Sequence, residues 1–284
     1  MDIYTRNKTL NKRAAMVVNL NGGYAMEIVQ AVSEKPTPSA FEVQVGDLGI
    51  FMAQEKVKDV EQAFNFYKTE GANLLSEVVT RPNGEKTFYV RDLDNNMFQV
   101  VPGGEWFHNS GHFSGGMRGC TIGVSNMEKS MELYADILGY GEVIYDETKV
   151  FDDWEGLPGG NHKCRKKKKK KTDEIGGGFA EVAGKGYIEL VQVMDREPKK
   201  IYEGRIWGDP GFVHLGFEVK GMPEVELELT AKGFPFTCDS SNQLSMGKTR
   251  VHCTYIEDPD GTLLELIEVY KIPIVEKWGI FMNV

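Results

Sequence analysis

Apolar residues recur at helical spacing in two stretches, 60–67 and 127–138, and a glycine follows each stretch. A period of three to four residues is typical of an amphipathic helix, so both stretches predict helices that bury one side. In 213–219, apolar and polar positions alternate instead, which predicts a strand with one buried face. The helical positions are Val60, Ala63, Phe64 and Tyr67 in the first stretch, and Met127, Met131, Tyr134 and Leu138 in the second.

The chain contains an internal repeat with an offset of 162 residues. Between positions 27 and 71, ten residues are identical to the residue 162 positions later, beginning with Glu27 and Glu189. Other matches are Gly46-Asp47 with Gly208-Asp209 and, after four inserted residues, Tyr89, Asp92 and Asp94 with Tyr255, Asp258 and Asp260. The two halves are therefore duplicates, and each tests what is inferred for the other.

Local signals order each half as a strand, a helix and further strands. Ser125 to Glu128 predicts a capping box that opens a helix after a short β-prone run. Pro223 suits the first turn of a later helix, and Gly233 suits its end. The turn sequence at 258–261 predicts a hairpin whose last strand is 263–269.

The composition is that of a globular protein, with 41% hydrophobic and 26% charged residues in 284. No window approaches the roughly 18 apolar residues of a membrane helix, and the first eight residues are polar. The four cysteines form no C-x-x-C pair, which gives no sign of a disulfide framework or a structural zinc site. We therefore expect a cytoplasmic protein without a membrane partner.

Positive charge is concentrated in one short segment. Lys163, Arg165 and the lysine run 166–171 carry eight positive charges, so the rest of the chain has a net charge of −17 against −9 overall. Such an acidic body disfavours a nucleic-acid partner, which needs a broad basic face. For the run we expect an exposed strand edge or a mobile loop whose charge discourages sheet aggregation. Attraction of an anionic substrate and a nucleic-acid or targeting role are the alternatives.

Three motifs are distributed along the segment from Arg118 to Tyr270. They are Ile122-Gly123-Val124-Ser125-Asn126-Met127-Glu128-Lys129-Ser130 with Leu133-Tyr134 and Leu138-Gly139-Tyr140, then Phe212-Val213-His214-Leu215-Gly216-Phe217-Glu218-Val219, and Asp258-Pro259-Asp260-Gly261-Thr262-Leu263-Leu264-Glu265-Leu266. Together they resemble the vicinal oxygen chelate superfamily, which includes glyoxalase I, bleomycin-resistance proteins and extradiol dioxygenases.

The resemblance implies an α+β fold in which tandem βαβββ modules form curled mixed sheets around a cleft. With the repeat, it predicts a degenerate N-terminal domain over 1–102 that lacks its first βα unit. A glycine-rich linker is expected at 103–118, a complete domain that carries the site at 119–270, and a tail at 271–284. An incomplete first domain would leave an open sheet edge for another chain, so a homodimer is one possible assembly.

The resemblance also implies a divalent metal, namely Zn, Ni, Fe, Mn or Mg, held by Glu189, His214 and Glu265. Strand parity agrees for two of them, because His214 and Glu265 each alternate with apolar neighbours and so face away from the packed side. The alternative is that these side chains are solvated or hydrogen-bonded polar groups in a site that has lost its metal.

Two positions depart from the superfamily's ligand pattern. The fourth ligand position falls on Gly119, which has no side chain, so water or substrate would complete the coordination. In the first half the repeat places Glu27, Met52 and Gln99 at ligand positions. With one strong ligand, a competent metal site there is not expected.

The implied reaction is that of a glyoxalase-like lyase or isomerase. Its small substrate would chelate the metal through two vicinal oxygens, and the metal would stabilise an enediolate while Glu265 or Glu189 moves a proton. Tyr255, ten residues before Glu265, matches a dioxygenase acid or base, although a tyrosine in that strand is also an ordinary packing residue. A ring-cleaving dioxygenase and a small-molecule-binding protein without catalysis are therefore the alternative functions.

Other polar residues near these motifs have simpler explanations. Cys253 is a candidate nucleophile or a small buried residue, and Glu218 is a candidate support for His214 or a surface residue. His108 and His112 lie in the glycine-rich segment, where we expect a solvated linker.

Overall fold

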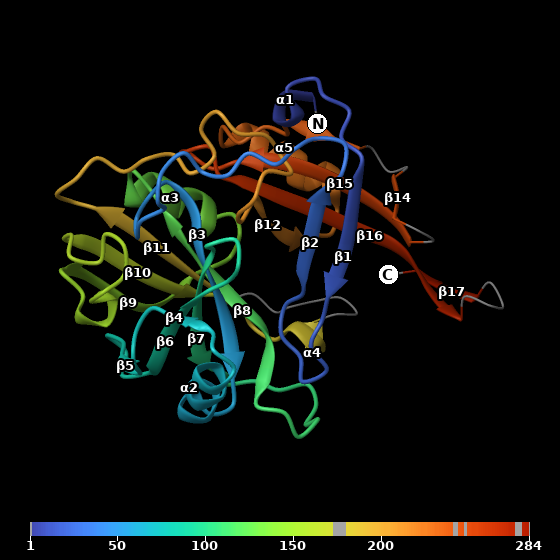
Figure 1. Cartoon of the computed structure of the whole chain (residues 1–284). Helices are drawn as coiled ribbons and strands as arrows, with labels where there is room; N and C mark the ends of the chain where they lie inside the picture. Colours follow the sequence, from blue (N-terminus) through green and yellow to red (C-terminus); the bar gives the residue numbers. More distant parts are fainter. Residues whose placement is uncertain (1, 173–179, 241–243, 247–248, 276–279, 284) are drawn as a thin grey trace. The chain divides into compact units, whose positions relative to one another are not determined.

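The computed structural model describes residues 2–172, 180–240, 244–246, 249–275 and 280–283 (Figure 1). Its contacts divide the chain into two compact units, a large unit, Asp2–Val213, and a small unit that begins at His214. Among the described residues, no helix is long and apolar enough to cross a membrane.

The large unit is built on one mixed sheet formed by two modules (Figure 1). Each module has a first strand, a helix and then further strands, as the repeat predicts. The first consists of β3 (Gly49–Val57), α2 (Val60–Thr69), β4 (Asn73–Leu74), β5 (Val79–Thr80), β6 (Lys86–Arg91) and β7 (Met97–Pro102). The second consists of β8 (Ser114–Gly123), α3 (Met127–Tyr134), β9 (Glu142–Lys149), η1 (Asp152–Trp154), β10 (Cys164–Lys170), α4 (Ala180–Ala183) and β11 (Tyr187–Val193).

Pairing between β3 and β8 joins the two modules. The sheet runs in the order β4-β6-β7-β3-β8-β11-β10-β9, and β3 and β8 are antiparallel neighbours at its centre. The glycine-rich segment predicted as a linker at 103–118 therefore ends inside β8. The division into compact units falls at residues 213 and 214 instead, because β8 binds the second module to the first.

Gly119, where the sequence predicts a fourth metal ligand position, has to be a glycine because β8 packs closely against β11. A Cβ at Gly119 would collide with the carbonyl oxygen of Tyr187 on the neighbouring strand β11. Close approach of two backbones is one of the situations that only glycine permits. No side chain of any chemistry fits at this position.

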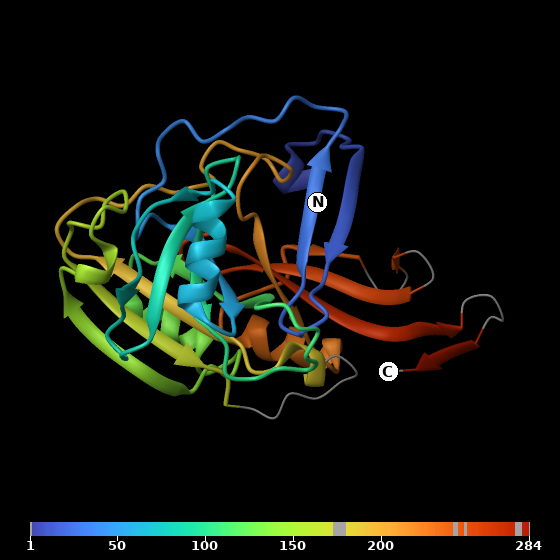
Figure 2. The same ribbon diagram turned by 60° about the horizontal axis from the view of Figure 1, so that its bottom comes forward.

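The two helices of the large unit begin and end as local chemistry directs. In α2, Asp59 accepts a hydrogen bond from the Gln62 backbone, and Gly71 follows the helix with a φ of 73°. Figure 2 shows α2 lying along the sheet, where it packs on β6 and β7. The capping side chain of α3 is Asn126, one residue beyond the predicted Ser125, and it accepts from the Lys129 backbone at 3.0 Å.

Two apolar clusters stabilise the large unit. One lies beneath α2, and the other includes the rings of Phe51, Phe151 and Trp154. Burial of a single large apolar side chain contributes roughly 1.5–3 kcal/mol, so clusters of this size account for much of the unit's stability. The first cluster comprises Val57, Val60, Ala63, Phe64, Phe88, Val90 and Val100.

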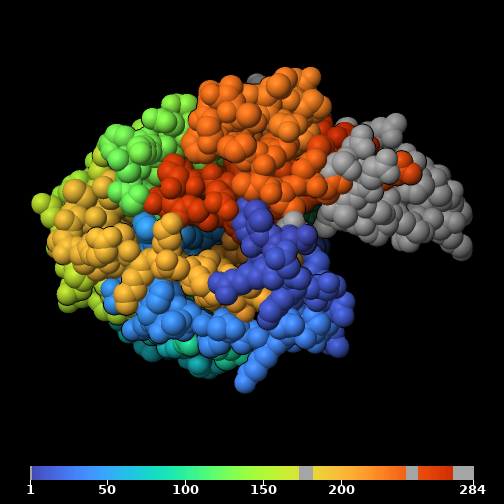
Figure 3. All heavy atoms as spheres, turned by 90° about the horizontal axis from the view of Figure 1, so that it is seen from above, coloured from blue at the N-terminus to red at the C-terminus, as the bar shows by residue number. Residues whose placement is uncertain are grey.

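Two connecting segments of the large unit, 32–48 and 194–213, lie side by side on the surface (Figure 3) and are joined by a matched pair of hydrogen bonds. Asp47 accepts from the Lys199 backbone at 3.0 Å, and Asp209 accepts from the Thr37 backbone at 2.7 Å. Each aspartate also accepts from a backbone N–H three residues earlier. The residues of one contact are related to those of the other by the 162-residue offset. The two matched Gly-Asp sequences therefore form equivalent contacts, each with the other segment.

The lysine run forms an interior strand, and the expectation of an exposed edge or mobile loop was wrong. It is β10, which is hydrogen-bonded to β9 on one side and β11 on the other. Lys166 and Lys168 are fully buried, whereas Lys167 pairs with Asp146 on the other face. Burial of an ammonium is costly unless it is paired or hydrogen-bonded, and Asp153 and Glu85 are the partners of Lys166 and Lys168.

The small unit has its own mixed sheet, in the order β12-β16-β15-β13, with β14 on β15 and β17 on β16. Its first strand is parallel to β16, as β3 is to β7 in the large unit. Pro223 lies in the first turn of α5, as predicted. The elements are β12 (His214–Glu218), α5 (Met222–Ala231), β13 (Cys238–Asp239), β14 (Leu244–Met246), β15 (Thr249–Glu257), β16 (Leu263–Val275) and β17 (Ile280–Asn283).

Residues 2–31 precede the first module within the large unit. They form a short helix, α1 (Asp2–Thr5), and an antiparallel hairpin of β1 (Lys12–Val17) and β2 (Met26–Ala31). Strand β2 carries Glu27 and is the repeat equivalent of β11, so the duplicated sequence keeps its strand character in both copies.

The buried pair of Lys166 and Asp153 gives a test of this fold. The Lys166 ammonium donates to Asp153 at 2.9 Å and lies 4.1 Å from the Trp154 ring centre. We expect Asp153→Ala to lower the free energy of unfolding by about 3–5 kcal/mol, because it leaves a buried ammonium without its anion. Adding Lys166→Met should recover a large part of this loss in urea unfolding. A double variant as unstable as the single one would show that the charge pair is not the cause.

Candidate functional site

The small unit brings together two of the predicted site residues, His214 and Glu265. His214 begins β12 and Glu265 lies on the adjacent parallel strand β16, where its register partner is Gly216. The Nε2 atom of His214 is 3.3 Å from Oε2 of Glu265. Alternation along each strand places both side chains on the same face, as predicted from parity.

Two further side chains converge on the other oxygen of Glu265. The hydroxyl of Tyr255 donates to Oε1 at 2.7 Å, and the thiol of Cys253 lies 3.0 Å from the same atom. Burial alone would raise the pKa of Glu265, but His214 and these two donors outweigh it and hold the pKa at about 2. The carboxylate is therefore ionised at neutral pH, and its two oxygens have different partners.

The repeat shows which part of this cluster is common to both halves. In the large unit, Tyr89 is paired in register with Gln99, as Tyr255 is with Glu265. The Gln99 amide donates to the Tyr89 hydroxyl at 3.0 Å. A tyrosine that binds the side chain ten residues later is thus an inherited structural contact, and Glu265 is what distinguishes the second copy.

Glu189, the third predicted ligand, lies on β11 of the large unit inside a network of fixed charges. Its carboxylate is bound by the guanidinium of Arg81 and accepts from the Tyr145 hydroxyl at 2.5 Å. Glu189 and Arg81 are almost completely buried. Burial opposes ionisation of Glu189, but Arg81, Lys166 and Lys168 outweigh it and lower its pKa.

A second charge cluster lies beside this pair. Glu85 accepts from Lys168 at 3.0 Å and from Arg118 at 3.1 Å, and Arg81 lies 3.6 Å away. Burial would raise the pKa of Glu85, but Lys168 and Arg118 hold it at about 2. Burial, followed by repulsion from Arg81 and Arg118, lowers the pKa of Lys168 to about 7. The interior of the large unit is therefore rich in cations.

Sequence reasoning missed Arg81, Glu85 and Tyr145. Arg81 and Glu85 lie in the turn between β5 and β6, and Tyr145 lies on β9. None belongs to a motif or a matched repeat position. The lysine run of β10 could have indicated the network, because buried lysines need partners. A run of one residue type does not show which of its lysines face inward, however, so the sequence did not reveal the partners.

The remaining candidates occupy less informative places. Glu218 is exposed at the end of β12, and Cys253 is buried on β15 beside Glu265. His108 and His112 are exposed in the segment before β8.

The pair of His214 and Glu265 fits a divalent metal by its geometry and donor type. Two ligands with bonds of roughly 2.1 Å to one ion lie about 3.0–3.4 Å apart, and the two atoms here are 3.3 Å apart. A neutral imidazole and a carboxylate suit borderline ions such as Zn, Ni or Fe. Two protein ligands leave positions for a further ligand, water or substrate.

Comparison with solved structures identifies the fold. Glyoxalase I from Zea mays aligns with 92% of this chain and 83% of its own, at a TM-score of 0.53 and 15% identity. A protein from Bacillus subtilis described as a candidate dioxygenase aligns with 89% of this chain and 71% of its own, at a TM-score of 0.55 and 15% identity. The chain has the vicinal oxygen chelate fold.

This fold confirms the α+β class with curled mixed sheets expected from the motifs. By sequence alone, no family model and no curated protein matches the chain. At 15% identity the structural likeness concerns the fold, so the chemistry has to be argued from the side chains described above.

The low pKa of Lys168 predicts a pH dependence of stability. In the unfolded chain a lysine titrates near 10.4, roughly, whereas folded Lys168 titrates at about 7. Between these values the unfolded chain binds more protons, so the free energy of unfolding rises with pH across this window. Lys168→Met should remove this increment, which is on the order of a few kcal/mol, in urea unfolding from pH 7 to 10.

Lys167→Met is the matched control, since Lys167 is the next residue of the same strand but faces the opposite side. Its pH profile should follow that of the unaltered protein. Identical pH profiles for Lys168→Met and Lys167→Met would contradict the assignment of this pH dependence to Lys168.

Proposed function

We propose that the chain is a metal-dependent enzyme of the glyoxalase type, a lyase or isomerase acting on a small substrate with vicinal oxygens. The single observation that carries this proposal is the pair of His214 and Glu265, whose ligand atoms are 3.3 Å apart on adjacent strands. The fold, which resembles that of glyoxalase I from Zea mays, is compatible with this reaction class. The sequence motifs around both residues resemble the same superfamily.

In this proposal His214 and Glu265 hold a divalent metal, which supplies Lewis-acid stabilisation of negative charge on a substrate oxygen. Glu265 is better suited to bind the metal than to act as a base, because a carboxyl with a pKa of about 2 has little affinity for a proton. Tyr255 fixes Oε1 and leaves Oε2 beside His214. Tyr255 is then a positioning residue.

The sequence assigned Glu189 both a ligand role and a share in proton transfer. Either role requires its carboxylate to exchange the Arg81 guanidinium for metal or substrate, and Arg81 is a strong competitor at such short range. We retain Glu189 as a proposed third ligand.

We expect the purified protein to bind one divalent ion per chain. His214→Ala should lower metal affinity at least about tenfold, since one of two neighbouring ligands is lost. Elemental analysis after dialysis against Zn, Ni, Fe or Mn measures this, with Cys238→Ala as a control on the same sheet. Metal-free native protein, or unchanged binding in His214→Ala, would rule out this site.

Catalytic activity should also depend on His214. Proton exchange on dicarbonyl or hemithioacetal substrates should need the added metal and should be abolished by His214→Ala. Oxygen consumption with catechols would instead support the dioxygenase reading. Tight substrate binding without turnover would support a binding protein.

Replacement of Tyr255 by phenylalanine tests its positioning role. Loss of a hydrogen bond to the ionised carboxylate should raise the pKa of Glu265 by roughly one unit. We therefore expect Glu265 of the metal-free protein to titrate at higher pH when followed by NMR, while the protein stays folded. Tyr89→Phe is the repeat-matched control and should leave that titration in place. An unmoved Glu265 titration in Tyr255→Phe would contradict this role.

A further inference from the structure

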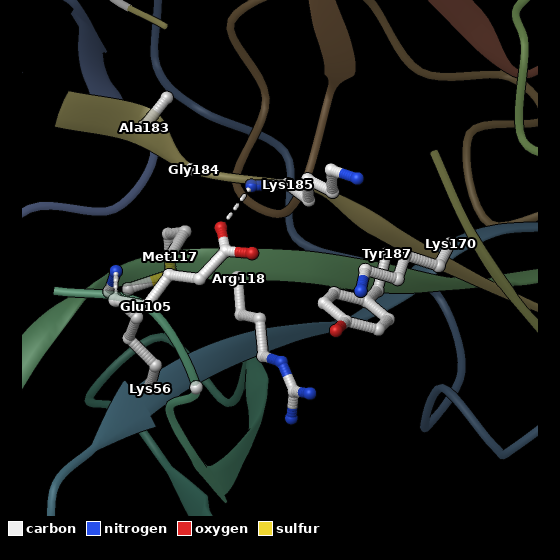
Figure 4. A pocket seen from close by; sticks show the side chains of 10 residues that line it. Lys56, Glu105, Met117, Arg118, Lys170, Ala183, Gly184, Lys185 and Tyr187 are labelled. Atoms are coloured by element: carbon white, nitrogen blue, oxygen red, sulfur yellow. Dashed lines mark hydrogen bonds between the residues drawn. The ribbon is translucent and has the colours of Figure 1, made fainter. Parts of the chain in front are cut away.

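The large unit contains a cavity of about 270 Å³, and four of its ten lining residues are cationic. Lys56, Arg118, Lys170 and Lys185 line it, and Glu105 is the one carboxylate among its lining residues. Figure 4 shows Glu105 and Lys56 on one side, Tyr187 and Lys170 on the other, and Arg118 between them. Within a chain of net charge −9, this is a local surplus of positive charge.

The charge of the cavity's lysines is only partly offset, because the Glu105 carboxylate attracts Lys56 without forming an ion pair with it. Lys56 is 4% exposed, and its ammonium donates to the backbone carbonyl of Glu105 at 2.7 Å. The Glu105 carboxylate instead accepts from the Lys185 backbone at 2.9 Å. In the described part of the chain, the ammonium groups of Lys56, Lys170 and Lys185 form no ion pair with a carboxylate.

Arg118 adds to this surplus. It is 8% exposed, and its guanidinium stacks 4.1 Å from the Tyr187 ring centre. Its anionic partner is Glu85, which is shared with Lys168 and lies 3.6 Å from Arg81. Glu85 therefore serves three buried cations, of which Arg81 is also bound by Glu189. Burial lowers the pKa of Lys56, the Glu105 carboxylate opposes this effect, and repulsion by Arg118 adds to it.

We propose that this cavity binds a small phosphorylated molecule through Lys56, Lys170 and Lys185. The three lysines belong to three different segments, and lysine ammonium groups bind phosphate as point charges. Both terminal nitrogens of Arg118 are already occupied by Glu85 and the Pro102 carbonyl, so the lysines supply the donors.

The size of the cavity limits the ligand. Sites for drug-sized molecules begin at roughly 300 Å³, so the cavity holds a phosphoryl group with a few carbon atoms. Tyr187 and Met117 provide apolar surface for those atoms. The inference uses residues that the proposed metal chemistry does not use, and it stands whether or not the metal is bound.

Titration calorimetry with inorganic phosphate at constant ionic strength tests the proposal. Binding should be saturable, and Lys170→Met with Lys185→Met should weaken it at least about tenfold, which corresponds to about 1.4 kcal/mol. Lys232→Met removes the same charge from an exposed site in the small unit and should change the affinity less than about twofold. His214→Ala should leave phosphate binding unchanged, which separates this result from any failure of the metal proposal.

Three results would overturn the proposal. They are no heat beyond that of equivalent chloride, equal affinity in the double variant and the Lys232→Met control, and binding of citrate without binding of phosphate. Because Lys170 and Lys185 are less buried than Lys56, their replacement should not prevent folding, and circular dichroism checks this.

Discussion

The antiparallel pairing of β3 with β8 is the constraint on which the arrangement of the large unit depends. It joins the first strands of two modules at the centre of one sheet, so both modules contribute side chains to the same interior. Gly119 allows the next pairing in the same sheet, because β8 can approach β11 only where no Cβ intervenes. The predicted fourth ligand position, Gly119, is thereby required for close packing of two backbones and has no side chain.

The two units use equivalent strand positions for different chemistry. In the large unit, Met52 and Gln99 stand where the small unit has His214 and Glu265, and the interior is filled by pairs such as Arg81 with Glu189. These pairs neutralise buried charge internally and leave a surplus of cations around Lys168 and Arg118. The tyrosine contact is common to both copies. The candidate metal site differs from its equivalent in the large unit at the two ligand positions, where Met52 and Gln99 replace His214 and Glu265.

Much of the fold was predictable from the sequence because it depends on local patterns and on the repeat. Parity along β12 and β16 placed His214 and Glu265 on one face, and the 162-residue offset matched Asp47 with Asp209 before their reciprocal contacts were known. The charge network was not predictable. Burial of Lys166 and Lys168 depends on partners 13 and 83 residues away in the chain, which no periodicity specifies. Likewise, only tertiary structure shows that Arg81 binds Glu189.

The central claim is that His214 and Glu265 hold a divalent metal. X-ray absorption spectroscopy of the protein loaded with one equivalent of Zn or Ni tests it most directly. The account predicts one imidazole and otherwise oxygen ligands, with the imidazole signal lost in His214→Ala. A spectrum without imidazole, or one unchanged by that substitution, would contradict it.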